Sequence, residues 1–287
     1  MNASVSSPHI GPRVWFITGT SQGFGRELVR TVLRGGDFVV ATSRDPQKVI
    51  STFESWTERL LAVALDLRDP HSISNAVSAG IARFGRIDVL VNNAGHGLLG
   101  AVEEASDAEI LQVYETNVFG LLRVTRAVLP HMRERHSGHV VNLSSIGGLT
   151  ASPGWGIYNS TKFAVEGLSE ALAQEVAPLG IRVTIVEPGP FRTDFLGGSL
   201  TAAAARLPDY DSTAGRTRTW RDSHNGAQKG DPALGAEAIV QAVTAAEPPL
   251  RLLLGGDAFE RANRKLNQQR SEFETWRELT HSTDFRS

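Results

Sequence analysis

The sequence contains no cysteine among its 287 residues, and this absence excludes several kinds of chemistry at once. Disulfide bonds, thiolate catalysis and zinc sites with cysteine ligands cannot occur in this chain. Neither charge sign dominates, since the formal net charge is −2, and no basic block indicates nucleic-acid binding. No apolar run is long enough to span a membrane, and residues 1–12 lack the basic and apolar regions of a signal peptide. We therefore expect a cytoplasmic protein that binds neither nucleic acid nor membrane.

The composition is that of an ordinary globular protein, with 41% hydrophobic and 21% charged residues. Short apolar runs predict strands, and stretches with helical spacing alternate with them. The expected strands are residues 13–18, 38–44, 60–65, 87–91, 139–143, 181–186 and 251–254, and the expected helices are residues 26–33, 70–84, 110–129, 158–176 and 233–245. This alternation predicts one α/β domain over residues 13–256, a doubly wound parallel sheet of about seven strands with helices on both faces. Residues 1–12 are expected to form a flexible lead, and residues 257–287 a helical extension.

A glycine-rich turn directly follows the first predicted strand. Residues 19–25 read GTSQGFG, and the helix after them ends at Gly35 and Gly36. A strand, a glycine turn and a helix in this order let a phosphate rest on backbone N–H groups at the helix N-terminus. The spacing G-x-x-x-G-x-G differs from the G-x-G-x-x-G of other dinucleotide folds and lacks the G-K-[ST] of a P-loop. We expect a nucleotide site here, because a Cβ at the glycines would block the turn or the ligand.

The same turn also matches G-x-S-x-G, the nucleophile elbow of α/β-hydrolases, with Ser21 as the nucleophile. A hydrolase would also need an acid and then a histidine later in the chain, and its elbow normally comes after several strands. Here the turn follows the first strand, and the late histidines, His224 and His281, lie in polar segments. We favour the nucleotide site and keep a serine hydrolase as the alternative from another class.

The end of the second predicted strand bears on the choice of cofactor. Dinucleotide enzymes that prefer NAD usually place an acidic residue there for the ribose 2′-hydroxyl, whereas an arginine suits the 2′-phosphate of NADP. This chain has Ser43 and Arg44 at that point, and Asp45 comes one residue later. We therefore expect NADP(H), with NAD(H) as the alternative.

Tyr158 and Lys162 are four residues apart and fall on one face of a predicted helix. An ammonium close to a phenol favours the phenolate and lowers the phenol pKa towards neutrality, which makes the pair a candidate acid/base device. Asn117 lies inside a predicted helix, where asparagine is normally neutral to unfavourable. His131, His136 and His139 have no common metal-ligand spacing, so we interpret their segment as a solvated connection and expect no metal site.

Taken in order, these motifs make the chain similar to the short-chain dehydrogenase/reductase family, in its compact single-domain Rossmann form and nearest to its hydroxysteroid- and retinol-dehydrogenase-like branch. The resemblance covers about residues 14–193 and continues more loosely to about residue 254. It rests on Thr18 and the glycine turn, Asp66, the NNAG of residues 92–95, Asn117, Ser145, Tyr158, Lys162, Pro188, Gly189 and Thr193. Ser145 lies thirteen residues before Tyr158, the interval usual in the family.

The resemblance implies a role for each matching residue. Ser145 would hydrogen-bond the substrate oxygen, Tyr158 would exchange a proton with it, and Lys162 would hold the nicotinamide ribose and lower the Tyr158 pKa. Asn117 would fix a water that links Lys162 to solvent. The implied cofactor residues are Gly19, Ser21, Gln22, Gly23, Phe24, Gly25, Arg44, Asp66, Leu67, Asn93, Ala94, Gly95, Tyr158, Lys162, Pro188, Gly189, Phe191 and Thr193.

The implied activity is hydride transfer between NADP(H) and a small ketone, aldehyde or secondary alcohol. Residues 191–230 begin apolar and turn polar, which favours a lid over a substrate with a hydrophobic body. Trp155 and Ile157 are further candidates for the pocket wall. The alternatives are an epimerase or dehydratase of the same family and a nucleotide-binding module without catalysis. The family is commonly oligomeric, so we expect a homo-oligomer, a dimer or a tetramer. The apolar residues Phe273 and Trp276 predict packing of the last helix against its own domain, with a dimer contact as the alternative.

Overall fold

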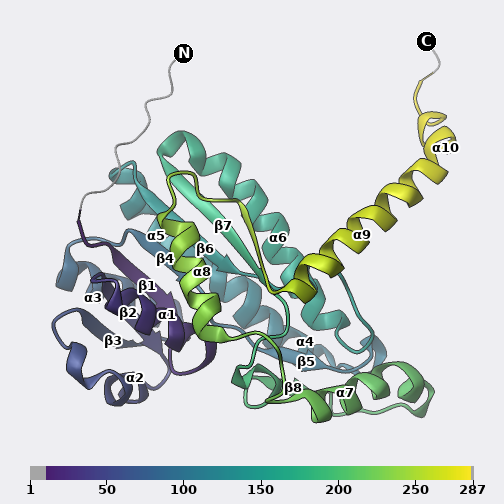
Figure 1. Cartoon of the computed structure of the whole chain (residues 1–287), viewed down its shortest axis with the longest axis horizontal. Coiled ribbons are helices and arrows are strands. Elements are labelled where there is room, and N and C mark those ends of the chain that lie inside the picture. Colours follow the sequence, from purple (N-terminus) through teal and green to yellow (C-terminus); the bar gives the residue numbers. More distant parts are fainter. Residues whose placement is uncertain (1–10, 286–287) are drawn as a thin grey trace.

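Seven parallel strands form the central sheet of the computed structural model, which describes residues 11–285 (Figure 1). The flexible lead expected over residues 1–12 lies almost wholly outside these residues. The strands follow one another across the sheet in the order β3-β2-β1-β4-β6-β7-β9. Their bounds are β1 Val14–Thr18, β2 Phe38–Ser43, β3 Leu60–Ala64, β4 Val89–Asn92, β6 Gly138–Leu143, β7 Ile181–Pro188 and β9 Arg251–Leu254. The strand order reverses between β1 and β4, where such sheets have a ligand crevice. The predicted doubly wound α/β fold is confirmed.

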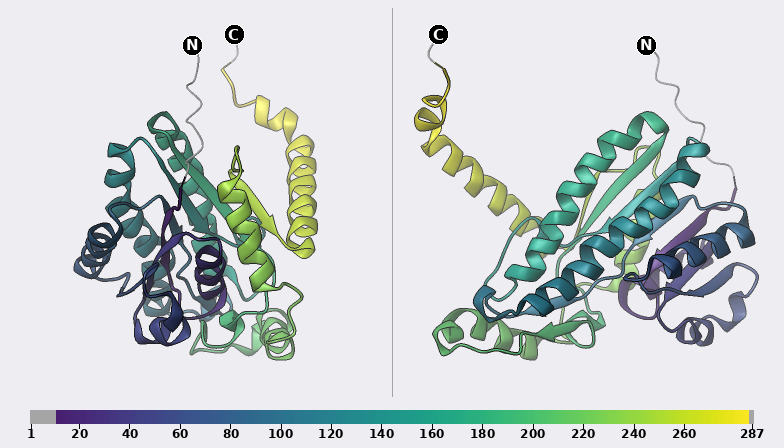
Figure 2. Two further views of the ribbon diagram at one scale, coloured as in Figure 1. Left: turned by 60° about the vertical axis from the view of Figure 1, so that its left-hand side comes forward. Right: turned by 180° about the vertical axis from the view of Figure 1, so that it is seen from behind.

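Helices cover both faces of the sheet (Figure 2). One face carries α1, α2 and α8, and the other carries α3, α5 and α6. Within β1, Trp15 and Ile17 pack under the first group while Val14 and Phe16 pack under the second. Both faces are therefore buried, which explains why the strands read as continuous apolar runs. The bounds are α1 Gly23–Arg34, α2 Gln47–Thr52, α3 Pro70–Phe84, α5 Leu121–Glu134, α6 Gly156–Val176 and α8 Pro232–Thr244.

The helix expected over residues 110–129 is longer and is interrupted. It begins as α4 (Asp107–Tyr114), widens into a π-helical turn at Glu115–Gly120 and continues as α5. Ser106 and Glu109 cap its start reciprocally, because each side chain accepts a hydrogen bond from the backbone N–H of the other residue. The π-turn contains Asn117, and π-turns inside helices are often found at functional sites.

The lid expected over residues 191–230 contains regular structure that the sequence analysis missed. Strand β8 (Leu200–Ala202) pairs in parallel with β5 (Gly97–Leu99), and α7 (Arg216–His224) follows. A buried ion pair joins this segment to the rest of the fold, because Arg218 of α7 bonds to the carboxylate of Glu104. Glu104 also accepts hydrogen bonds from the backbone N–H groups of Ala101 at 2.7 Å and Leu207 at 2.9 Å. The segment is therefore held to the domain by a fully bonded carboxylate.

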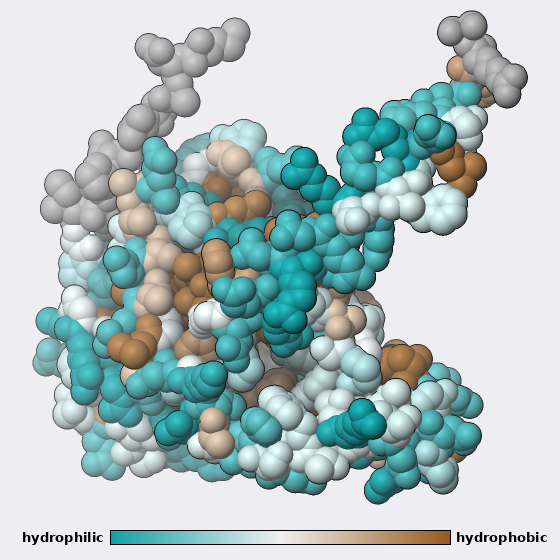
Figure 3. Space-filling view, turned by 45° about the vertical axis from the view of Figure 1, so that its right-hand side comes forward, coloured by the Kyte–Doolittle hydropathy of each residue, from teal (hydrophilic) through white to brown (hydrophobic). Residues whose placement is uncertain are grey.

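The C-terminal helix α9 (Gly256–Thr275) leaves the domain after its first turns and ends in the short α10 (Arg277–His281) (Figures 1 and 2). Ala258 and Ala262 are buried against Ile146, but Phe273 is 71% and Trp276 62% exposed. The expectation that these aromatic residues pack against their own domain is wrong, because the helix projects outward at that point. Figure 3 shows the projecting helix with a largely hydrophilic surface and hydrophobic residues near its outer end.

His139 also departs from the sequence analysis. It was interpreted as part of a solvated connection, but it is buried in β6, where its Nε2 lies 2.9 Å from Thr184 Oγ1. Burial lowers the pKa of its imidazole to about 3, which keeps the ring neutral. Over residues 11–285 we find no grouping of three histidine or acidic side chains suited to a metal ion. Within the same range, no helix has the length and apolar character that crossing a membrane requires.

Candidate active site

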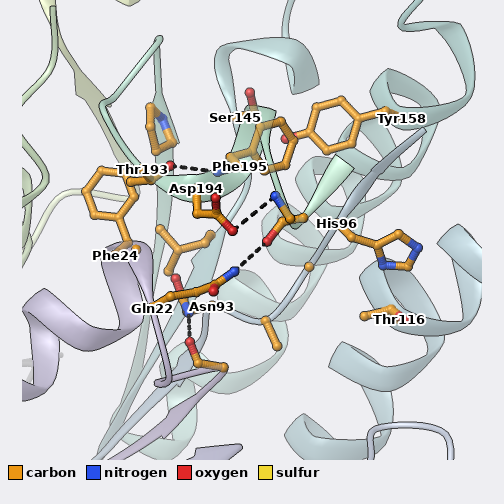
Figure 4. A pocket seen from close by; sticks show the side chains of 18 of the residues that line it. Gln22, Phe24, Asn93, His96, Thr116, Ser145, Tyr158, Thr193, Asp194 and Phe195 are labelled. Atoms are coloured by element: carbon orange, nitrogen blue, oxygen red, sulfur yellow. Dashed lines mark hydrogen bonds between the residues drawn. The ribbon is translucent and has the colours of Figure 1, made fainter. Parts of the chain in front are cut away.

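A cavity of about 700 Å³ opens at the carboxyl ends of the central strands. It is large enough for a dinucleotide together with a small substrate. Nearly all the predicted site residues line it, although they come from segments spread between residue 19 and residue 193 of the chain. The exceptions are Gly25 and Asn117, which lie directly behind the lining residues. Figure 4 shows Ser145, Tyr158 and Phe195 together in one part of this cavity, with Gln22, Phe24 and Asn93 in another.

The glycine turn has the geometry of a phosphate cradle. Gly19 and Gly23 adopt φ angles of +70° and +57°, a region that side chains with a Cβ rarely occupy. A Cβ on Gly25 would collide with the carbonyl oxygen of Gly19 and lie 2.6 Å from Asn93 Nδ2. No side chain caps the N-terminus of α1, and its first turn contains no acidic residue. The backbone N–H groups there suit the pyrophosphate of a dinucleotide, so the chain fits the cofactor that the sequence predicted.

Thr18, the last residue of β1, and Asn93, which follows the neighbouring strand β4, hold this turn in place. Asn93 Nδ2 donates to the carbonyl oxygens of Thr18 at 2.8 Å and Gly19 at 2.9 Å. In return, Thr18 Oγ1 accepts from the backbone N–H groups of Asn93 and Ala94, both at 3.0 Å. The first residues of the NNAG motif therefore position the glycine turn as well as line the cavity.

Arg44 and Asp66 lie at the end of the cavity formed by β2 and β3. Arg44 is exposed and has no carboxylate within 4 Å in the part of the chain that the structure describes. Asp45, the next acidic residue, is 3.9 Å from Lys48. Asp66 bonds to Arg68 at 2.7 Å, and this bond lowers the pKa of its carboxyl to about 2. This end of the cavity therefore presents an exposed cation, Arg44, that has no carboxylate beside it among the described residues.

Ser145, Tyr158 and Lys162 meet at the other end of the cavity. Ser145 follows β6, while Tyr158 and Lys162 lie on the first turns of α6. A Cβ on Gly147 would contact both Ser145 Oγ and the Tyr158 ring, which shows how close these two side chains lie. Lys162 Nζ donates to the carbonyl oxygen of Leu143 at 2.7 Å and lies 5.8 Å from the centre of the Tyr158 ring.

The pKa values at this end differ from the sequence prediction. Burial raises the pKa of Tyr158 to about 12, and the neighbouring Ser145 offsets part of that rise. Burial also lowers the pKa of Lys162 to about 8. The expectation that Lys162 draws the Tyr158 pKa down is not met, because the ammonium faces the Leu143 carbonyl and desolvation dominates for both groups. Tyr158 is therefore protonated at neutral pH and can act as a proton donor.

Asn117 acts on the site through the main chain of His96. Its Oδ1 accepts from the His96 N–H at 3.0 Å, and its Nδ2 donates to the His96 carbonyl at 2.9 Å and to Thr161 Oγ1 at 3.1 Å. These bonds tie the end of the NNAG segment to α6. The water that Asn117 was expected to fix beside Lys162 stays a prediction.

Aromatic side chains enclose the space beside Tyr158. The ring centres of Trp155 and Phe195 lie 5.7 and 5.3 Å from that of Tyr158, and Trp155 and Phe195 stack on each other. Phe195 and the buried Leu196 come from the segment expected to be a lid, and both line the cavity. Of the two wall candidates from the sequence, Trp155 lines the cavity and Ile157 does not.

The sequence analysis did not identify several residues that line the cavity. Gln228 is 4% exposed, and neither polar atom of its amide has a partner within the described range. His96 is half-buried next to the NNAG motif, and desolvation lowers the pKa of its imidazole. Its position directly after that motif could have drawn attention to it. Ser152 and Arg261 also line the cavity, and no sequence signal marked either of them.

The structure does not support the hydrolase alternative. Ser21 lines the cavity, but between residues 11 and 285 no histidine is hydrogen-bonded to it. His224 instead stacks on Trp220 at 4.7 Å and lies 2.9 Å from Ser223 Oγ. A nucleophilic serine needs a base within hydrogen-bond reach, and here that base is missing from the described residues.

Comparison with known proteins agrees with this geometry. The short chain dehydrogenase family matches residues 13–203. "Oxidoreductase BOA17" of Botryotinia fuckeliana is 39% identical and matches over 93% of this chain and 98% of its own length. The 3-ketodihydrosphingosine reductase of Bacteroides thetaiotaomicron is 38% identical over 85% of this chain and 88% of its own. A short-chain dehydrogenase structure from Streptomyces avermitilis superimposes with a TM-score of 0.90 at 43% identity, covering 96% of this chain and all of that one.

Similar solved structures carry a nicotinamide cofactor of either kind. A 3-ketoacyl-(acyl-carrier-protein) reductase from Brucella melitensis, 28% identical with a TM-score of 0.71, is complexed with NADH. ElxO, 27% identical with the same TM-score, has NADP bound. The extent of the match and the geometry of the cavity lead to one conclusion. The chain belongs to the short-chain dehydrogenase/reductase family and is an NAD(P)-dependent oxidoreductase.

Proposed function

We propose that this protein uses NADP(H) to interconvert a ketone or aldehyde and an alcohol, on a substrate with a hydrophobic body. The observation that carries the proposal is the meeting of Ser145, Tyr158 and Lys162 beside an aromatic wall at one end of the cavity. The bound nicotinamide would supply or accept the hydride. The chain itself must bind the substrate oxygen and move one proton to or from it.

Tyr158 and Ser145 are placed for this proton transfer. The phenol of Tyr158 is protonated at neutral pH, because burial raises its pKa to about 12. In the direction of reduction, its O–H donates the proton to the substrate oxygen, and Ser145 Oγ holds that oxygen by a second hydrogen bond.

Three groups of residues would hold the cofactor. The glycine turn and α1 bind the pyrophosphate, and Asp66, Leu67 and the NNAG segment enclose the adenosine. Lys162 holds the nicotinamide ribose, and the carboxamide lies against residues 188–193. Arg44 and Ser21 bind the 2′-phosphate, and the exposed, unpaired guanidinium of Arg44 supports NADP over NAD.

The hydrophobic body of the substrate would contact Trp155, Phe195 and Leu196. Two of these residues belong to the lid, so a bound substrate would itself help to order the segment. The similarity to a protein named 3-ketodihydrosphingosine reductase supports the reduction of a ketone. The placement in the hydroxysteroid- and retinol-dehydrogenase-like branch is supported by retinol dehydrogenase 8 of Bos taurus, which is 36% identical over 84% of this chain.

We also propose that the protein is a homo-oligomer assembled through α9. Phe259, Leu266 and Phe273 are spaced seven residues apart on this helix and are 58%, 63% and 71% exposed. A strict seven-residue apolar repeat is the pattern of a two-stranded coiled coil. In an antiparallel pair of these helices, Phe259 of one copy would lie opposite Phe273 of the other, with Leu266 between them.

The test of the enzymatic proposal is NADPH oxidation with a panel of aryl and alkyl ketones, by the wild type and Tyr158→Phe. The variant keeps the aromatic ring and removes only the proton donor. We expect turnover to fall roughly 100- to 10,000-fold while NADPH binding, followed by nicotinamide fluorescence, stays unchanged. Turnover retained by Tyr158→Phe would exclude Tyr158 as the proton donor. Reaction products without net NADPH oxidation would favour an epimerase or dehydratase.

A further inference from the structure

Arg261 of α9 borders the substrate end of the cavity. It is half-buried, and its Nη2 donates to Thr150 Oγ1 at 2.8 Å and Ser152 Oγ at 3.3 Å. These two hydroxyls belong to the loop between β6 and α6, which also carries Ser145. Helix α9 thus projects from the domain, but its first turns bring a guanidinium to the cavity wall.

A short series of hydrogen bonds links Arg261 to the catalytic serine. Ser152, which Arg261 contacts, donates through its backbone N–H to Asn159 Oδ1 at 3.2 Å. Asn159 Nδ2 donates to the carbonyl of Gly147 at 2.9 Å, and the Gly147 N–H donates to Ser145 Oγ at 3.0 Å. Asn159 is also the residue after Tyr158. Arg261 is therefore tied to the loop that carries Ser145, at the end of the cavity away from Arg44.

Arg261 has no ion-pair partner among the described residues. No carboxylate lies within 4 Å of its guanidinium in residues 11–285; the same holds for Arg44 and Lys162, whereas Lys48 and Arg68 have acidic partners. Burial and the neighbouring Arg264 both lower the pKa of Arg261, and Asp257 offsets this only in part. Its Nε and Nη1 donate to no acceptor in the described range. These two donors are open to the cavity, and an anion bound there would pair with this partly desolvated cation.

We propose that Arg261 binds a carboxylate of the substrate, so that the substrate is an oxo acid or hydroxy acid with an apolar body. The inference rests on the proposed function, because it assigns a carboxylate to the end of the substrate opposite the carbonyl. The carbonyl itself would lie at Ser145 and Tyr158. Trp155 and Phe195 would enclose the apolar part between the two ends. The planar guanidinium presents paired donors that match the two oxygens of a carboxylate.

Two other roles for Arg261 give different results when it is replaced. If it only ties α9 to the loop, its loss alters stability and lowers activity with every substrate alike. If it contacts the cofactor, its loss weakens NADPH binding. If it binds a substrate carboxylate, its loss lowers activity with acids and leaves activity with their esters unchanged. Arg264→Met is the matched control for charge, because Arg264 is exposed on the same helix and does not line the cavity. Thr150→Val is the control for the loop contact.

The experiment compares aryl oxo acids with their methyl esters as substrates of the NADPH-loaded full-length protein. The acids are 4-oxo-4-phenylbutanoate, 5-oxo-5-phenylpentanoate and 6-oxo-6-phenylhexanoate, which place the carboxylate progressively farther from the ketone. We expect wild-type kcat/KM to favour the acid over its ester at one of these lengths by at least about tenfold. Arg261→Met should remove this preference through KM and leave the ester and NADPH binding unchanged. Arg264→Met and Thr150→Val should retain it.

Two results would overturn the inference while the proposed function stands. One is reduction of esters as efficiently as acids at every length by the wild type, and the other is an equal loss for acid and ester in Arg261→Met. If neither acids nor esters are reduced, the proposed function is in question. Calorimetric titration of the NADP⁺-loaded protein with the same acids then decides the role of Arg261 separately. Binding that is equal in the wild type and Arg261→Met would contradict it.

Discussion

Lys162 Nζ lies 5.8 Å from the centre of the Tyr158 ring and donates a hydrogen bond of 2.7 Å to the backbone carbonyl of Leu143. Both ionisable groups are buried, and burial opposes the charged form of each. The pKa of Lys162 therefore falls to about 8 while that of Tyr158 rises to about 12. Holding Lys162 in this buried position therefore lowers the stability of the folded protein. The dependence of the unfolding free energy on pH can measure by how much.

Lys162→Met should change how the stability of the protein depends on pH. The folded pKa of Lys162 is about 8 and its ordinary value is 10.5, so the unfolded chain binds more protons between these values. Wild-type stability should therefore rise with pH across this window, by at most about 3 kcal/mol. The variant lacks this contribution, so the stability of the wild type relative to the variant should increase from about pH 8 to about pH 10.

Urea unfolding at a series of pH values measures this difference. Lys229→Met is the control, because Lys229 is exposed and should leave the wild-type pH profile unchanged. A Lys162→Met profile parallel to that of the wild type would show that Lys162 is not desolvated. Turnover by the variant should be lost at every pH, because Lys162 is proposed to hold the nicotinamide ribose of the cofactor.

The fold and the phosphate cradle could be predicted from the sequence because local signals specify them. The central strands are buried on both faces, so their apolar runs are visible without a partner, and GTSQGFG has glycine where the backbone requires it. Tyr158 and Lys162 could be paired from their spacing, but Ser145 could be placed only through family resemblance. Ser145 and Tyr158 are separated by a loop whose path brings them together, and the spacing alone does not show that contact.

The remaining site residues depend on tertiary packing and left no local signal. Gln228 and Arg261 enter the cavity from segments that the sheet topology brings back over it. The π-turn that orients Asn117 towards His96 reads in sequence as ordinary helix. The pKa of Tyr158 also depends on burial, which a four-residue spacing to Lys162 does not reveal.

Gly25→Ala should disrupt the cradle, whereas Gly167→Ala should stabilise the protein. A Cβ at position 25 would collide with the Gly19 carbonyl, which is backbone and cannot move aside. We expect an unfolding free energy lower by about 1–3 kcal/mol and loss of NADPH binding.

Gly167 is exposed in α6 with no atom within 4 Å of its Cβ position. Alanine there should add about 0.5–1 kcal/mol. Denaturant unfolding checks both values, and a tolerated Gly25→Ala would contradict the described turn.

Arg44→Ala should weaken the binding of NADPH and leave NADH binding nearly unchanged. The only chemical difference between the two cofactors is the 2′-phosphate, which Arg44 is proposed to bind. Losing its bonds should cost about tenfold or more in NADPH affinity. Fluorescence titration of the reduced nicotinamide measures both constants. Arg34→Ala, at an exposed position on the last turn of α1, serves as the control. Equal losses for the two cofactors, or tighter NADH binding by the wild type, would reverse the assignment.

Phe273→Glu should dissociate the proposed dimer without unfolding its subunits. Phe273 is 71% exposed on the projecting part of α9, so a charge there costs the isolated subunit little. In an antiparallel pair of α9 helices, the same charge would be buried against the apolar stripe of the partner. Sedimentation equilibrium should therefore show a dimer for the wild type and a monomer for the variant, with the same thermal transition at low concentration.

Leu234→Glu is the matched control, because Leu234 is 63% exposed on α8 and is not part of the apolar repeat of Phe259, Leu266 and Phe273. It should leave the dimer intact. A wild type that is monomeric at micromolar concentration would exclude α9 as a stable interface. A dimer that survives Phe273→Glu would place the contact on another surface.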